Sequence, residues 1–156
     1  MPRYYKKKFV RGSRDKYSVE QQAGALQVPA NSQAWATIVA DTGVQGMRKV
    51  KHLTVSLASH EVTTQTASQL AYWALVYVPQ GTSVNSMNIT GTSGMYEPNQ
   101  FVMNCGCVDF SAGPVRFSSP VSRNLNSGDK IVLIMANISG GEVYYYYTVR
   151  YAITLQ

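Results

Sequence analysis

The sequence predicts an all-β fold, a sandwich of eight antiparallel strands that follows a short basic arm. Three observations support this prediction. Short apolar runs, several of them with a period of two residues, alternate with clusters of Gly, Pro, Asn and Ser along most of the chain. No segment shows a convincing helical period. The 156 residues suffice for one domain with its own core and without metal or disulfide staples.

Residues 1–14 form the predicted arm, and residues 15–156 form the predicted sandwich domain. The arm reads MPRYYKKKFVRGSR and has no burial pattern, so we expect it to be disordered in the free protein. The first sixteen residues hold seven cations and one acid, a net charge of +6 that equals the charge of the whole chain. From residue 17 onward seven cations balance seven acids. The basicity therefore belongs to the arm.

The body divides into eight candidate strands. The last of them alternates, so that Val143, Tyr145 and Tyr147 are expected in the core while Tyr144 and Tyr146 lie on the opposite face, in an interface or a lumen. Long connections near 80–99 and 109–113 are expected on the surface. Strands without helices fit a jelly roll or another Greek-key sandwich. The expected strands are 16–26, 33–41, 47–58, 68–79, 100–108, 114–119, 129–138 and 142–155.

Two candidate strands are apolar on both faces, Leu70 to Val78 and Ile131 to Ala136. Strands of this kind are normally covered twice. The second cover is expected to be a long loop or a neighbouring subunit. Charged residues make up only 14% of the chain, well below the quarter typical of soluble domains, which also favours a surface covered by partners.

Four short segments carry a family resemblance: Asp15–Glu20, Tyr96–Gln100, Ser122–Asp129 and Val149–Thr154. They resemble segments of the capsid proteins of circular, Rep-encoding single-stranded DNA viruses, relatives of the circoviruses. The resemblance implies a single jelly roll, about sixty copies in a closed icosahedral shell and a lumenal arm. It further implies packaging of circular single-stranded DNA, a location in the virion and traffic through the host nucleus. The chain departs from this family in being short and in having fewer arginines in its arm.

The candidate nucleic-acid-binding residues fall in two groups. In the arm, aromatic rings alternate with cations, so that the cations can meet phosphates and the rings can stack on unpaired bases. The second group, at the start of a strand, is either a phosphate contact or a charged, solvated strand edge. Nothing in either group reads base identity. The arm can also act as a solubilising or nuclear-targeting tail. The residues are Arg3, Tyr4, Tyr5, Lys6, Lys7, Lys8, Arg11 and Arg14 in the arm, Lys16 directly after it, and Arg48, Lys49 and Lys51 further along the body.

Other classes of site find little support in the sequence. Cys105 and Cys107 are too close for an easy mutual disulfide, and with only His52 and His60 to help them a zinc site is not expected. We see no nucleophile motif and no phosphate-binding glycine loop, so we expect neither an enzyme nor a cofactor. No signal peptide or membrane-spanning segment is visible, and the thiols are expected to be reduced inside the cell.

Two competing functions belong to other classes. One is a non-viral β-sandwich that binds a carbohydrate or protein ligand and carries a basic targeting tail. A carbohydrate binder should expose aromatic residues, whereas Trp35 and Trp73 are expected inside apolar strands. The other is a single-strand-binding OB barrel, for which eight strands are too many. Arg116, Arg123 and Arg150 are interpreted as structural or inter-subunit partners of the acids of the body.

Overall fold

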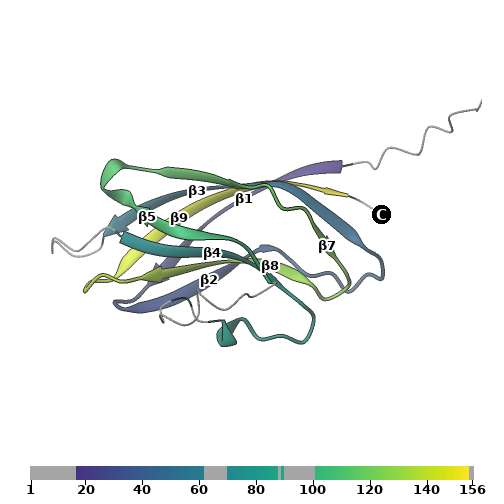
Figure 1. Ribbon diagram of the computed structural model, residues 1–156, viewed down its shortest axis with the longest axis horizontal. Coiled ribbons are helices and arrows are strands. Elements are labelled where there is room, and N and C mark those ends of the chain that lie inside the picture. Colours follow the sequence, from purple (N-terminus) through teal and green to yellow (C-terminus); the bar gives the residue numbers. More distant parts are fainter. Residues whose placement is uncertain (1–16, 62–69, 88, 90–100, 155–156) are drawn as a thin grey trace, which may run out of the picture.

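The computed structural model describes residues 17–61, 70–87, 89 and 101–154, which form a sandwich of two antiparallel sheets (Figure 1). One sheet has the order β1-β9-β3-β6, with β7 paired to the start of β3, and the other has the order β2-β8-β4-β5. The strands are β1 (Tyr17–Val28), β2 (Ser32–Val39), β3 (Arg48–Glu61), β4 (Leu70–Val78), β5 (Val102–Asp109), β6 (Val115–Ser119), β7 (Arg123–Leu125), β8 (Lys130–Asn137) and β9 (Val143–Thr154), with short 3-10 helices η1 (Val84–Ser86) and η2 (Phe110–Ala112).

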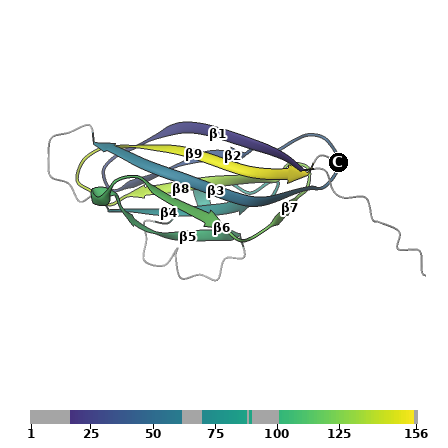
Figure 2. The ribbon, with the colours of Figure 1, turned by 90° about the horizontal axis from the view of Figure 1, so that it is seen from above.

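The strand pairing is that of a jelly roll. The first strand pairs with the last, β2 with β8, β3 with β6 and β7, and β4 with β5, as in a long hairpin rolled up on itself. Figure 2 shows β1, β9, β3 and β6 side by side across one face of the sandwich. The expected fold class is therefore confirmed, and the pairing decides between the jelly roll and other Greek-key sandwiches.

All eight expected strands are present, with ends within three residues of the expected positions. The ninth, β7, was not expected. It has three residues, too few for any alternation to show, and it forms because it lies against Arg48–Val50 at the start of β3. The expected arm, residues 1–14, lies outside the described residues.

Alternation along the strands fills the core between the sheets. Tyr145 and Tyr147 are buried as expected, whereas Tyr146 is 49% exposed on the opposite face of β9. In β3 the alternation shifts at a β-bulge: the pairing with β9 skips between Lys51 and Thr54, and His52 has a φ of 54°. This extra residue keeps both Val50 and Leu53 in the core.

A second apolar layer covers the outer face of the β2-β8-β4-β5 sheet. Val84 and Ile89, from the connection after β4, pack on outward-facing residues of β4 and β8. Gln33 of β2 holds this connection at two points, because its side chain donates to the Met87 carbonyl (2.8 Å) and accepts from the Ile89 N–H (2.9 Å). The second cover of the doubly apolar strands is thus a loop of the same chain. Figure 1 shows η1 lying beneath this sheet.

Two buried polar side chains hold the connections at the ends of the strands. Asp129 accepts hydrogen bonds from the Tyr77 hydroxyl (2.7 Å), the Asn126 N–H (2.8 Å) and the Gln80 N–H (3.0 Å). The fully buried Asn137 carries a second set of bonds. Its amide donates to the carbonyls of Val28, Pro29 and Gly141, and its carbonyl accepts from Ser139.

Candidate nucleic-acid interface

The arm joins the body beside the basic cluster of β3. Tyr17 is the first described residue of β1, and the Lys51 ammonium lies 4.6 Å from the centre of its ring. The arm's candidate residues all lie outside the described residues, so their contact with nucleic acid stays a prediction. These residues are Arg3, Tyr4, Tyr5, Lys6, Lys7, Lys8, Arg11 and Arg14, together with Lys16 directly after the arm.

The structure divides the three candidate cations of β3 between two faces. Lys49 and Lys51 alternate with the buried Val50 and so belong to the outer face of the sheet, where both are half-buried. Arg48 has the same parity as Val50, and its guanidinium donates a hydrogen bond to the Ala40 carbonyl (2.9 Å). Arg48 therefore ties a neighbouring connection to β3 and lies apart from the two lysines.

Two further cations share the outer face with these lysines, and sequence reasoning missed them. Arg150 of β9 and Arg116 of β6 are both exposed, and they pair in register with Thr54 and Ser56 of β3. In the described part of the chain neither arginine forms an ion pair with a carboxylate of its own chain. These two arginines were expected, with Arg123, to be structural or inter-subunit partners of the body's acids, and the inter-subunit alternative stays a prediction. Only the register of three strands brings them together, and the sequence does not display it.

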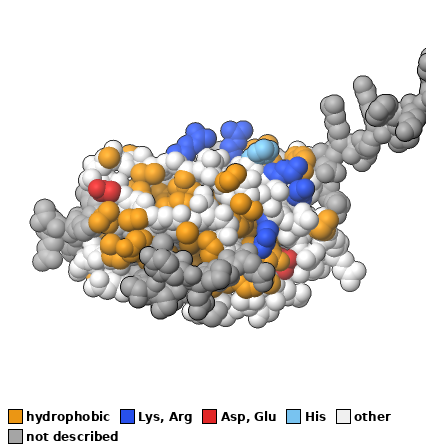
Figure 3. Space-filling model, viewed as in Figure 1, with side chains coloured by type: hydrophobic (Ala, Val, Ile, Leu, Met, Phe, Trp, Pro, Cys, Tyr) orange, Lys and Arg blue, Asp and Glu red, His pale blue; other side chains and the backbone are white. Residues whose placement is uncertain are grey.

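The described acids lie away from these cations. Glu20 is exposed and accepts from the Tyr151 hydroxyl (2.6 Å). Burial, together with this hydrogen bond and the charge of Glu20, raises the pKa of Tyr151. Glu142 accepts from Gln27, at the end of β1 far from Tyr17. The other acids whose side chains the structure describes, Asp41, Asp109 and Asp129, lie in connections or at a strand end. In Figure 3 the Lys and Arg side chains gather along the upper border, over the β1-β9-β3-β6 sheet.

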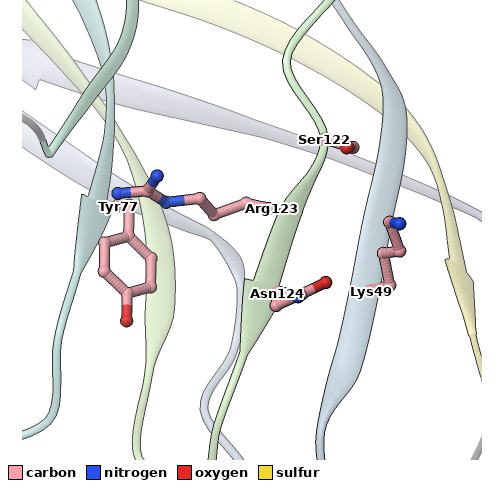
Figure 4. Close-up of a pocket in the computed structure, with 5 residues that line it drawn as sticks. All are labelled: Lys49, Tyr77, Ser122, Arg123 and Asn124. Carbon is pink, nitrogen blue, oxygen red and sulfur yellow. The ribbon is translucent and has the colours of Figure 1, made fainter.

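A polar cavity of about 330 Å³ opens at the edge of this sheet, between Lys49, Ser122 and Asn124 on one side and Tyr77 and Arg123 on the other. Figure 4 shows the Arg123 guanidinium lying over the Tyr77 ring, 4.6 Å from its centre. Burial raises the pKa of Tyr77, and the hydrogen bond to Asp129 and that group's charge raise it further. The Tyr77 phenol is therefore neutral, and its hydroxyl is held in the hydrogen bond to Asp129. The cavity offers two cations, a hydroxyl and an amide, which suits an anion better than it suits catalysis.

The remaining candidate sites are quickly described. Cys105 and Cys107 are exposed, free thiols on β5. Within residues 17–61, 70–87, 89 and 101–154 no three His, Cys, Asp or Glu side chains come together as metal ligands. No helix in the same residues is long and apolar enough to cross a membrane. Trp73 is buried as expected, but Trp35 is 40% exposed, because it lies on the outer face of β2 at the margin of the covering loop.

No protein-family model and no curated protein sequence matches this chain. Among solved structures, the capsid asymmetric unit of cyanophage Pam1 is similar, with a TM-score of 0.41 and 15% identity over 97% of this chain and 99% of that chain. The capsid protein of BFDV, crystallised as a decamer, is similar with a TM-score of 0.41 and 8% identity over 90% of this chain and 99% of that chain. The jelly-roll assignment rests on the strand pairing itself.

Proposed function

We propose that this protein is a viral capsid protein that packages circular single-stranded DNA through its basic arm. About sixty copies form a closed icosahedral shell, with the arms in the lumen. The observation that carries the proposal is the combination of a charge-balanced jelly-roll body with an arm that holds the whole net charge of +6. Assembly takes place in the host nucleus, and the mature location is the virion.

The surface of the body supports self-association. The body has only a few charged residues to keep a monomer soluble. Large apolar side chains are exposed in connections and on edge strands. Contacts between copies would remove them from water. Among the described residues, the exposed large apolar side chains outside the sheet that carries Arg116 and Arg150 are Trp35, Val44, Met47, Leu70, Val102 and Val121.

In a closed symmetric shell, the small charge of each arm is multiplied by the number of copies. With about sixty arms of +6 each, roughly 360 positive charges face one cavity, which disfavours closure unless a polyanion neutralises them. A packaged single strand supplies that polyanion. Binding of this kind depends on phosphates and stacking, so we propose little preference for sequence.

A second candidate function is a carbohydrate- or protein-binding sandwich with a targeting tail, and the exposure of Trp35 favours it. The Lys130 ammonium, however, lies 5.7 Å from the centre of the Trp35 ring, and its indole N–H donates to Asn85 (3.3 Å). Sugar stacking would have to displace the lysine. A Trp35→Ala variant that assembles normally but loses binding to a glycan array would favour this alternative.

Electron microscopy and sedimentation of the recombinant protein test the proposal. We expect large spherical particles that contain nucleic acid. Deletion of residues 2–14 should leave particles or folded protein but lower the ratio of absorbance at 260 nm to that at 280 nm. A stable monomer at every ionic strength would refute the shell, and an unchanged absorbance ratio would refute the role of the arm.

A further inference from the structure

The two outer faces of the sandwich differ in what covers them. On the β2-β8-β4-β5 sheet, the connection after β4 forms a second apolar layer, so that Ala74, Val76 and Val132 are buried although they point away from the main core. On the β1-β9-β3-β6 sheet, no described segment packs on the outer face. There the outward-facing Val19 is 60% exposed and Tyr146 is 49% exposed. As far as the described residues go, this second face is the one left open to a large partner.

Cations on the open face are spread over three neighbouring strands, with Lys51 on the middle strand β3 and Arg150 and Arg116 on the strands to either side of it. Lys51 of β3 pairs with Ala152, Arg150 of β9 pairs with Thr54, and Arg116 of β6 pairs with Ser56. At about 3.3 Å per residue and 4.8 Å per strand, Lys51 and Arg150 are roughly 9 Å apart, and Arg150 and Arg116 roughly 12 Å. Long, flexible side chains cover such gaps, so the three charges form one track. Lys49 extends the track toward the polar cavity at β7.

The neighbours of this track leave the cations available. Beside the arginines the outward positions of the strands are small or polar, such as Thr54, Ser56 and Ala152, and no described carboxylate lies among them. The exposed ring of Tyr146, on the same face of β9, is suited to stacking on an unpaired base. The start of the track is Lys51, which contacts Tyr17 where the arm joins β1. The point at which the arm is attached to the body therefore lies beside the track.

We infer that the outer face of the β1-β9-β3-β6 sheet is a second binding surface for single-stranded nucleic acid, with Lys49, Lys51, Arg116 and Arg150 as its phosphate contacts. The inference rests on the proposed packaging function and gives it a surface on the folded body. Phosphate is recognised by charge, so the surface takes any sequence. Because its cations belong to a rigid sheet, the track also fixes the direction in which the strand leaves the arm.

The test compares full-length variants that each remove three charges. In one, Lys51, Arg116 and Arg150 are replaced by Gln. In the other, the arm residues Lys6, Lys7 and Lys8 are replaced by Gln. Binding of a fluorescent oligothymidylate is measured by anisotropy at several salt concentrations, with protein at nanomolar concentration and the sedimentation coefficient recorded in parallel.

Each lost phosphate contact should reduce the slope of log affinity against log salt by about 0.7, so the face variant should lose about 2. An Arg116→Lys/Arg150→Lys variant should keep the slope of the unmodified protein, because lysine preserves the charge. Lys130→Gln, on the other sheet, should also keep it. Circular dichroism and thermal unfolding check that every variant is folded.

The outcomes separate this inference from the packaging proposal. An unchanged slope in the face variant, with a reduced slope in the arm variant, would overturn the inference and leave packaging by the arm intact. Unchanged slopes in both would overturn both. An unchanged slope with impaired sedimentation as large particles would assign the face to contacts between copies, and would likewise overturn the inference.

Discussion

Replacing Asp129 with Asn should destabilise the fold by about 3 kcal/mol at neutral pH. The carboxylate is 4% exposed and accepts hydrogen bonds from Tyr77, Asn126 and Gln80, which joins the end of β4 to the turn before β8. An amide keeps one acceptor and presents two donors, so at least one of the three N–H or O–H groups loses its partner. A hydrogen bond to a charged group contributes about 1.5–3 kcal/mol. The loss is a large part of a typical stability of about 5–15 kcal/mol.

The same contacts set the direction of the pH dependence. Burial alone would raise the pKa of Asp129, but the hydrogen bonds from Tyr77, Asn126 and Gln80 outweigh it and hold the pKa below the ordinary value of 3.8. A carboxyl group with a lowered pKa in the folded state stabilises the fold fully above the unfolded value and loses that contribution as the pH falls through the folded value. The difference in stability between the unmodified protein and Asp129→Asn should therefore be constant above about pH 5 and shrink below pH 4.

Urea unfolding between pH 3 and pH 7, followed by the fluorescence of the buried Trp73, measures this difference at a fixed protein concentration. Asp109→Asn is the matched control, because Asp109 caps η2 through the Ser111 N–H (2.9 Å) but is exposed. It should cost much less. An Asp129→Asn variant as stable as the unmodified protein, or a difference that persists unchanged at pH 3, would refute the reasoning.

Three further substitutions probe the packing. Asn137→Ala should cost about 2–4 kcal/mol in urea unfolding, since it leaves buried backbone groups without partners; a loss below 1 kcal/mol would contradict the bonding described. Leu133→Asp places an unpaired charge at a fully buried position and should abolish soluble particles, so a well-assembled variant would show the core to be misplaced. Gly24→Ala adds a Cβ against the Tyr147 hydroxyl and should cost about 1–3 kcal/mol. Part of that loss should be recovered by Tyr147→Phe, and thermal unfolding of the double variant would reveal a failure to do so.

The strands were predictable because alternation is a local signal. In β9 every second residue from Val143 to Ile153 is buried, and the period of two is visible without any knowledge of the partner strands. The bulge at His52 was not predictable, since it consists of a mismatch between β3 and β9. The exposure of Trp35 was hidden for a related reason. An apolar strand does not reveal where a covering loop ends.

The candidate site was predictable only in its local part. Cations that are consecutive or nearly so, such as Lys49 and Lys51, stand out in the sequence. Arg116 and Arg150 lie 34 positions apart and join them only through the register of β6, β3 and β9. Arg48 is the opposite case: it is close to the lysines in the sequence, but it points to the other face of the sheet and donates to the Ala40 carbonyl. A count of charges along the chain thus identifies basic segments, but it does not identify a charged surface that several strands of a sheet build together.

The difference between the two outer faces also bears on why the loop after β4 is long. A jelly roll exposes two outer faces, and the proposed packaging of nucleic acid requires one of them to be hydrated and charged. Apolar strands such as β8, in which every residue from Ile131 to Asn137 is buried, cannot line a wet face. Covering them with Val84 and Ile89 of the same chain completes that side within the monomer, before any neighbour arrives. The polar, basic sheet on the other side needs no such cover, and the arm begins at its edge strand β1. The chain therefore places its second apolar layer on one side of the core and four of its seven described cations, Lys49, Lys51, Arg116 and Arg150, on the other side.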